Sequence, residues 1–233
     1  MTDLNPDHFT PDRLAADLDQ HGYAVRPLLD PATCRVLEAL YDADSPFRKR
    51  IVMENHGYGR GEYKYFAYPL PPVVSELRAR LYPPLAVVAN RWRHALGIDE
   101  KFPDTLGEYL DRCHAAGQTR PTPLMLRYAK DGFNCLHQDL YGDLVFPMQT
   151  VILLSDPDRD FTGGELMLVE QRPRAQSRGE IVHLRQGDAA IFPVRERPVR
   201  GVRGYHRVMM RHGVSRLLSG NRHTLGIIFH DAA

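Results

Sequence analysis

From residue 123 onward the chain consists of short apolar runs that are interrupted by Gly, Pro and Asp, and this pattern constrains the fold most. Short apolar runs that end in turn residues are typical of strands. We expect strands over residues 123–129, 133–138, 147–155, 164–170, 180–185, 188–193, 206–215 and 222–230. Strands of this length and spacing predict a closed or double-sheet antiparallel architecture, either a barrel or a jelly roll.

The first half of the chain is predicted to be mainly helical. Helices are expected over residues 11–21, 31–41, 73–96 and 105–116. In the third of these, Pro83 and Pro84 should kink or divide the helix, because proline cannot donate the backbone hydrogen bond. The chain is therefore expected to be one α+β domain, residues 1–233, with a helical N-terminal region in residues 1–121 and a β core in residues 122–233.

The composition indicates a soluble protein with one sizeable core. Hydrophobic residues make up 43% of the 233 residues and charged residues 25%, which is ordinary for a globular domain. No apolar stretch approaches the roughly 20 residues that span a bilayer, and the N-terminal sequence MTDLNPDHFTPDRL has no signal-peptide pattern. The three cysteines, Cys34, Cys113 and Cys135, are expected to be reduced, buried thiols of a cytoplasmic protein.

Charge is distributed unevenly along the chain, although the formal net charge is only +1. Residues 1–45 carry nine acidic residues and three arginines, whereas residues 171–222 carry twelve arginines and three acidic residues. Such segregation predicts a positive surface that suits a polyanionic or acidic partner. A solvated arginine-rich surface is the alternative.

Two candidate metal ligands lie close together at the end of an expected strand. In LRYAKDGFNCLHQDLYG, His137 and Asp139 are two residues apart. Residues i and i+2 of an extended chain project to the same face, so both side chains can reach one ion. Imidazole and carboxylate are also the ligand types of a non-haem Fe(II) site.

A second group of polar residues lies in RHGVSRLLSGNRHTLGIIFHD. His212 opens an apolar-rich strand, and Arg222 and Thr224 share one face of the last strand. An arginine that points inward there requires a buried anion, because an unpaired buried guanidinium is costly. A ligand carboxylate would satisfy it through two parallel hydrogen bonds. His206 lies six residues before His212, so strand parity alone leaves both as candidate ligands.

The combination of an HxD pair, a distant His and an Arg-x-Thr resembles the Fe(II)/2-oxoglutarate-dependent oxygenases, over about residues 122–231. The resemblance implies a double-stranded β-helix and an iron site of His137, Asp139 and His212, since the family's spacing favours His212 over His206. It also implies that Arg222 and Thr224 bind the carboxylate of 2-oxoglutarate, with a hydrogen bond from Tyr128. The implied reaction converts 2-oxoglutarate and O₂ to succinate and CO₂ while a C–H bond is hydroxylated.

Further motifs resemble a bacterial oxygenase family that is predicted to act on alkylated nucleic acid, of the AlkB-like or Oxygenase-NA type. These motifs are HGYGRGEYKYF, LHQDLYG, DFTGGE, EQRPR, RHGVSR and GIIFHD. The resemblance implies oxidative demethylation of DNA or RNA. The short distance from His212 to Arg222 is instead typical of prolyl-hydroxylase-like enzymes, so hydroxylation of a protein side chain is the alternative activity.

The segment FRKRIVMENHGYGRGEYKYF interleaves basic and aromatic residues, which suit phosphates and unstacked bases. Arg60, Tyr63, Lys64 and Tyr65 are the candidate substrate contacts, on a glycine-containing lid. The arginines at 195, 197, 200, 203, 207 and 211 could extend a phosphate track. Core packing of the aromatic residues is an open alternative. A hypothesis of another class is a non-catalytic, cupin-like module that binds metal or polyanion.

Overall fold

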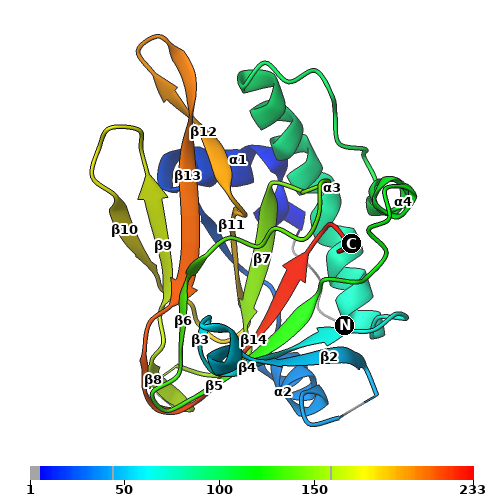
Figure 1. The fold of residues 1–233 in the computed structure, drawn as a ribbon, viewed down its shortest axis with the longest axis vertical. Coiled ribbons are helices and arrows are strands. Elements are labelled where there is room, and N and C mark those ends of the chain that lie inside the picture. Colours follow the sequence, from blue (N-terminus) through cyan, green and yellow to red (C-terminus); the bar gives the residue numbers. More distant parts are fainter. Residues whose placement is uncertain (1–5, 44, 158) are drawn as a thin grey trace.

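The computed structural model describes residues 6–43, 45–157 and 159–233; Asp44, Asp158 and the first five residues of the acidic N-terminal segment lie outside the described residues. Two antiparallel sheets form the centre of the molecule (Figure 1). The eight-stranded major sheet contains, in spatial order, β1 (Ala24–Pro27), β11 (Asp188–Pro193), β7 (Met148–Leu153), β14 (Leu217–Ile228), β5 (Leu124–Ala129), β4 (Glu62–Phe66) and β2 (Phe47–Val52), with β8 (Phe161–Gly163) paired to β14.

The six-stranded minor sheet contains β10 (Arg178–Val182), β9 (Leu166–Gln171), β13 (Gly204–Val214), β6 (Phe133–His137) and β3 (Gly59–Arg60), with β12 (Glu196–Gly201) paired to β13. Every expected strand of the second half corresponds to a strand of the structure, and the predicted α+β class is confirmed. Two strands of this half, β8 and β12, were not expected from the sequence. Both pair with only one neighbour, and β12 is rich in charged residues, so it lacks the apolar run by which the other strands were recognised.

Helices cover the outer face of the major sheet (Figure 1). They are α1 (Pro11–His21), α2 (Pro31–Leu40), α3 (Pro72–Ala95) and α4 (Leu106–Ala115), with 3₁₀ turns at Pro6–Phe9 and Met53–His56. Side-chain caps begin two of them: Asp30 accepts a hydrogen bond from Thr33 N, and Thr105 accepts one from Glu108 N. No helix in the described residues has the length and apolar character needed to span a membrane.

Helix α3 is not divided at Pro83 and Pro84, contrary to one of the two predicted outcomes. An interior proline costs about 3 kcal/mol. Burial offsets this cost, because each fully buried large apolar side chain contributes about 1.5–3 kcal/mol. Seven such side chains of α3 pack into the main core, namely Val74, Leu77, Leu81, Tyr82, Leu85, Val88 and Trp92.

The N-terminal region is not only helical, and this corrects the sequence prediction. Strand β1 pairs with β11, and β4 pairs with β5, so residues from both halves share the major sheet. The segment expected to be a flexible lid contains β4, in which Tyr63 lies opposite Leu126 and Tyr65 opposite Leu124. The sequence EYKYF alternates polar and aromatic residues, which is the pattern of a strand with two different faces.

The cysteine prediction is correct for two of the three residues. Cys34 and Cys113 are buried in the main core, whereas Cys135 is exposed. Cys135 lies on β6 at the same parity as His137, and both residues line the cavity described below. The thiol of Cys135 is therefore part of an open surface and not of the core.

Candidate active site

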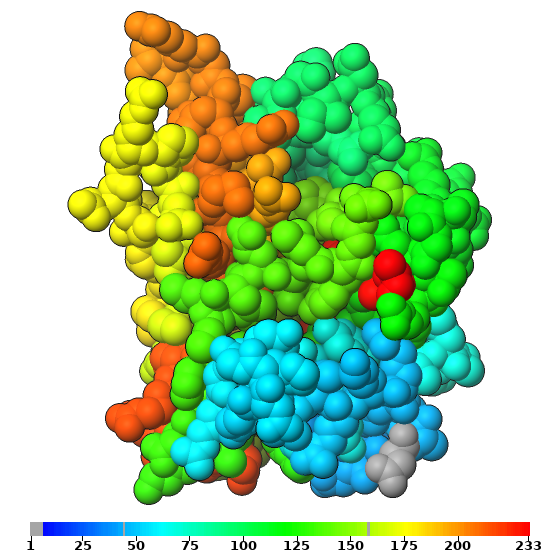
Figure 2. Space-filling model, viewed as in Figure 1, coloured from blue at the N-terminus to red at the C-terminus, as the bar shows by residue number. Residues whose placement is uncertain are grey.

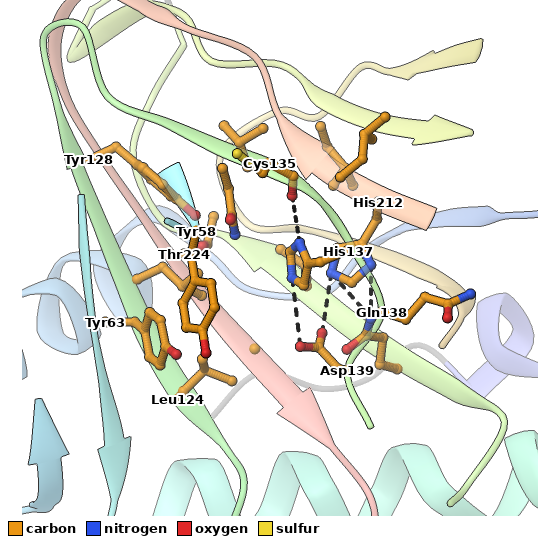
Figure 3. Close-up of a pocket in the computed structure, with 18 of the residues that line it drawn as sticks. Tyr58, Tyr63, Leu124, Tyr128, Cys135, His137, Gln138, Asp139, His212 and Thr224 are labelled. Atoms are coloured by element: carbon orange, nitrogen blue, oxygen red, sulfur yellow. Dashed lines mark hydrogen bonds and ion pairs between the residues drawn. The ribbon is translucent and has the colours of Figure 1, made fainter. Parts of the chain in front are cut away.

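A cavity of about 430 Å³ lies between the two sheets, and the predicted metal ligands line it together with Arg222 and Thr224 (Figure 3). The major sheet contributes side chains of alternate residues on β4, β5, β7 and β14. The minor sheet contributes side chains from β6, β9 and β13. In β14, Arg222 and Thr224 face this cavity while Leu225 and Ile227 pack toward the helices, as the two-residue period of a strand requires.

The three predicted metal ligands converge at one end of the cavity. His137 ends β6 and lies directly opposite His212 on β13, which brings their ring centroids to 4.1 Å. Asp139 follows two residues after His137; its Oδ1 is 3.6 Å from His137 Nε2 and its Oδ2 is 3.2 Å from His212 Nε2. Potential ligand atoms of the three side chains lie within 4.8 Å of one another. The three side chains can therefore bind one metal ion from the same side.

A hydrogen bond to the backbone orients the His137 ring so that its Nε2 can bind a metal ion. Its Nδ1 donates to the carbonyl oxygen of Cys135 at 2.7 Å, which leaves the lone pair of Nε2 pointing toward Asp139. Burial lowers the pKa of His137, and the neighbouring His212 lowers it further. The imidazole is therefore neutral near pH 7, as a metal ligand must be.

The carboxylate of Asp139 is ionised in spite of its burial. Burial alone would raise its pKa, but hydrogen bonding and charge from His212, together with His137 and a hydrogen bond from Tyr141, hold the pKa below its ordinary value. The Tyr141 hydroxyl donates to Oδ1 at 2.8 Å. An ionised carboxylate held in one orientation is a suitable ligand for a divalent cation.

Two residues beside the metal ligands were missed by the sequence argument. Tyr141 orients Asp139, and the Gln149 side-chain nitrogen lies 3.4 Å from both ring nitrogens of His212. Gln149 has a sequence signal, because it is an amide residue in the strand MQTVIL, in which Thr150 is the one other polar residue. The sequence signal for Tyr141 is weaker. Tyr141 lies two residues after Asp139, and residues two apart in an extended segment project to the same side.

Arg222 lies at the inner part of the cavity and is nearly fully buried, with 2% of its surface exposed. Its Nε and Nη1 have no hydrogen-bond partner among the described residues. Burial lowers its pKa to about 10, so the side chain is still a cation near pH 7. The rings of Tyr128 and Phe161 lie 5.8 and 5.9 Å from the guanidinium carbon, but no carboxylate pairs with it among the described residues. A buried cation without an anionic partner indicates a site for an anionic ligand.

The groups around Arg222 complete this anion site. Thr224 follows two residues later on the same face of β14, and Tyr128 lies directly opposite Arg222 on β5. The Tyr128 hydroxyl is buried and also lacks a partner among the described residues. The backbone of Gly164 packs closely here: a Cβ at this position would lie 3.2 Å from Arg222 Cδ and 2.4 Å from Leu217, which explains a glycine in the motif DFTGGE.

The structure separates the four candidate substrate residues into two pairs. Tyr63 and Tyr65 line the cavity together with Tyr58 (Figure 3). Lys64 points to the other face of β4, where its Nζ donates to the carbonyl oxygen of Tyr41 at 2.7 Å. Arg60 is exposed outside the cavity, 3.8 Å from Glu54. Of the four candidate substrate contacts, Tyr63 and Tyr65 thus lie at the cavity, and Lys64 and Arg60 lie outside it.

Two further candidate residues from the sequence lie away from the cavity. His206 is exposed on the β12–β13 hairpin and takes no part in the cluster of metal ligands. Arg197, expected to contact phosphate, is buried and binds Glu170 at 2.5 Å and the carbonyl oxygens of Leu18 and Asp19. It ties the hairpin to α1 and is not available to a ligand.

The side chains present fit Fe(II) and 2-oxoglutarate. Two imidazoles and one carboxylate on a single face are the donor set of non-haem Fe(II) oxygenases, in which the other metal positions remain open for ligands. The unpartnered guanidinium of Arg222, beside a hydroxyl, fits the distal carboxylate of a dicarboxylate ligand. Iron would be held by His137, Asp139 and His212, and 2-oxoglutarate by Arg222 and Thr224.

Comparison with known proteins agrees with this geometry. The family model Oxygenase-NA, described as an oxygenase catalysing oxidative methylation of damaged DNA, matches residues 61–232. The chain belongs to the Oxygenase-NA family. Two uncharacterized proteins of Mycobacterium tuberculosis, Rv2227 of strain H37Rv and MT2286 of strain CDC 1551, are each 51% identical over 191 residues, or 80% of this chain and 82% of theirs.

Solved structures support the same fold for this Oxygenase-NA protein. A Pseudomonas putida prolyl-4-hydroxylase aligns with a TM-score of 0.58 and 15% identity, over 96% of this chain and all of the other. A Burkholderia pseudomallei oxidoreductase of the 2OG-Fe(II) oxygenase family aligns with a TM-score of 0.55 and 17% identity, over 96% and 93% of the two chains. The core is thus the predicted jelly roll. The protein is an oxygenase by its family, and its cluster of His137, Asp139 and His212 suits Fe(II).

Proposed function

We propose that this oxygenase oxidises methyl groups on alkylated nucleic-acid bases, so that the unmodified base is restored and the methyl carbon leaves as formaldehyde. The description of its family names damaged DNA. Dioxygen and 2-oxoglutarate carry no methyl group to transfer, so oxidation of a methyl group already present on the base is the reaction that suits these cosubstrates. One oxygen atom enters the methyl C–H bond and the other enters succinate, with release of CO₂. The N-hydroxymethyl product then breaks its C–N bond.

The observation that carries this proposal is the aromatic wall of the cavity opposite the metal ligands. Tyr58 and Tyr63 face the cluster of His137 and Asp139 across the cavity (Figure 3). The rings of Tyr63 and Tyr65 are perpendicular, with centroids 5.3 Å apart. Together they offer a ligand in the cavity the face of one aromatic ring and the edge of another. Flat aromatic walls favour a planar ligand such as a base, and each stacked base contributes about 1–3 kcal/mol.

The protein's own groups have distinct tasks in this reaction. Bound iron and 2-oxoglutarate supply the oxidising power. Tyr141 and the carbonyl oxygen of Cys135 hold Asp139 and His137 in the orientation that binds the metal. Arg222 anchors the cosubstrate, and the tyrosine wall positions the methyl group. Because the cavity lies between the two sheets, the target base must be unpaired or flipped out of a duplex to enter it.

The test is the simultaneous measurement of formaldehyde and succinate with methylated single-stranded DNA and RNA, Fe(II), 2-oxoglutarate and air. We expect the two products in equal amounts, and neither product from the His212→Ala variant. The Tyr58→Ala variant should weaken binding of the methylated strand by about 5- to 150-fold, equivalent to the loss of one stack. Succinate that forms only with a protein extract, without formaldehyde from any methylated strand, would contradict the proposal and support side-chain hydroxylation instead.

A further inference from the structure

Two hairpins of the minor sheet, β9–β10 and β12–β13, project from the body of the molecule along one side (Figures 1 and 2). Residues 166–214, which contain both hairpins, carry ten arginines and four acidic residues. Strand β12 pairs only with β13, so the end of this hairpin is not covered by another strand of the sheet. At its turn Val202 is fully exposed and Tyr205 is 52% exposed.

The arginines of the β12–β13 hairpin fall into three groups. Arg197 is structural, as described above, and Arg207 lies 3.3 Å from Glu196. The side chains of a third group are exposed, and no hydrogen bond or ion pair holds their guanidinium groups within the described part of the chain; this group consists of Arg195, Arg200, Arg203 and Arg211. We call these four residues the free arginines. Their charge is not neutralised within the protein.

The pairing register places several of these cations on the outer face of the hairpin. Arg200 lies directly opposite Tyr205, so both side chains project to the same face. Tyr205, Arg207 and Arg211 are spaced along β13 by two residues or a multiple of two, which also directs them to this face. Arg203 lies in the turn that precedes β13. Same-face neighbours on a strand are about 7 Å apart. The opposite face is apolar, because Val208 and Met210 pack into the second core cluster.

One end of this row is adjacent in sequence to a metal ligand, although it lies on the other face of the strand. Arg211 precedes the metal ligand His212, and the Gln138 side chain, between the other two ligands, donates to the carbonyl oxygens of Met210 at 2.8 Å and Arg195 at 3.3 Å. The turn at Val202 is ten residues from His212 along the strand, which corresponds to about 33 Å. The outer face thus extends from the backbone next to His212 to the turn of the hairpin, and a strand bound there would pass from the cavity to this face.

We propose that the outer face of the β12–β13 hairpin binds the sugar–phosphate backbone of the strand whose target base occupies the cavity, an inference that rests on the proposed function. Unpaired cations at regular spacing fit a linear polyanion. Guanidinium groups bind phosphates through two parallel hydrogen bonds, and exposed Tyr205 offers a surface on which an unpaired base stacks. The hairpin contributes to binding of long strands and does not contribute to chemistry at the metal.

The experiment compares two double variants that remove the same charge. Arg200→Gln/Arg203→Gln alters the hairpin, and Arg35→Gln/Arg80→Gln alters exposed positions on α2 and α3 as the control. The first measurement is the affinity for an unmethylated, fluorescently labelled 15-nucleotide single strand as a function of salt. Each phosphate contact in single-stranded nucleic acid contributes about 0.7 to the slope of log K against log salt. The hairpin variant should lose about 1.4 of this slope, and the control variant none.

The second measurement is formaldehyde release from a methylated trinucleotide and from a methylated 15-nucleotide strand. The hairpin variant should have an increased KM for the long strand only, with the trinucleotide reaction and kcat unchanged. Equal salt slopes for the two double variants, or equal KM changes on both lengths, would overturn the inference. Binding of an acidic peptide of the same charge with equal affinity and equal hairpin dependence would also overturn it. Formaldehyde release by the wild-type protein from neither strand would instead refute the proposed function.

Discussion

Replacement of Arg222 by methionine should stabilise the protein in the absence of 2-oxoglutarate and abolish its response to this cosubstrate. Arg222 is 2% exposed, and two of its nitrogens have no partner among the described residues. Each buried polar group without a partner costs about 1–3 kcal/mol, and apolar replacements of buried charges stabilise proteins by about 1–4 kcal/mol. We therefore expect the free energy of unfolding to rise by about 2–4 kcal/mol in Arg222→Met.

The melting temperature is a direct measure of this effect. In a domain of this size 1 kcal/mol corresponds to about 2–4 °C, so the cosubstrate-free variant should melt about 4–16 °C above the wild-type protein. Anaerobic 2-oxoglutarate with Fe(II), at 100 times its Kd, should stabilise the wild-type protein by about 2.7 kcal/mol. The same concentration of 2-oxoglutarate should add no stability to Fe(II)-loaded Arg222→Met, because the carboxylate anchor is absent.

The matched control is Arg216→Met, which removes an arginine with a 66% exposed side chain from the loop before β14. It should change neither the melting temperature nor the response to 2-oxoglutarate by a measurable amount. The reasoning is refuted if Arg222→Met melts below the wild-type protein without cosubstrate. It is equally refuted if the variant keeps the wild-type shift on addition of 2-oxoglutarate, since the anion site would then lie elsewhere.

Three further predictions concern the metal ligands and the core. The His212→Ala variant should lose turnover, measured as succinate formation, whereas His206→Ala should keep it, because His206 is exposed and distant from the cluster; the reverse result would show that the ligand assignment is wrong. Tyr141→Phe should weaken Fe(II) binding about 10- to 100-fold, since it removes the hydrogen bond that orients a ligand carboxylate; unchanged affinity in an anaerobic titration would contradict this role. Burial lowers the pKa of His230 to about 4 from 6.5. A lowered histidine pKa means that the folded state binds this proton less well than the unfolded state, so stability is complete above pH 6.5 and falls toward pH 4, by about 3 kcal/mol for this group; urea unfolding of His230→Gln across this range should lack that component.

Much of the fold could be predicted from local pattern. Strands of the second half were recognised as apolar runs between turn residues, and α1 and α2 by proline and acidic residues at their starts. Strand β4 was missed although EYKYF alternates cleanly, because its aromatic residues were interpreted as a mobile lid. Its partner β5 lies 59 residues later, from Tyr65 to Leu124, and pairing over such a separation has no local sequence signal.

The site residues likewise divide into those that the local sequence pattern predicts and those that only the folded structure reveals. His137 and Asp139, or Arg222 and Thr224, share a face because they are two residues apart on a strand, which the sequence reveals directly. Tyr141 and Gln149 became apparent as partners of the ligands only when the strands were placed in space. A hydrogen bond depends on the relative position of two segments and not on the spacing within either one.

What the sequence by itself determined was the chemistry that this protein can hold: two imidazoles, a carboxylate and an inward arginine, each at a defined parity on an apolar strand. Only the tertiary structure decided which residues of each type are available. Arg197 is neutralised by Glu170, 27 residues away, whereas Arg200 and Arg203 are free. The physical reason is that parity is a property of the covalent chain, whereas burial and ion pairing depend on contacts between segments that are distant in sequence and meet only in the folded state.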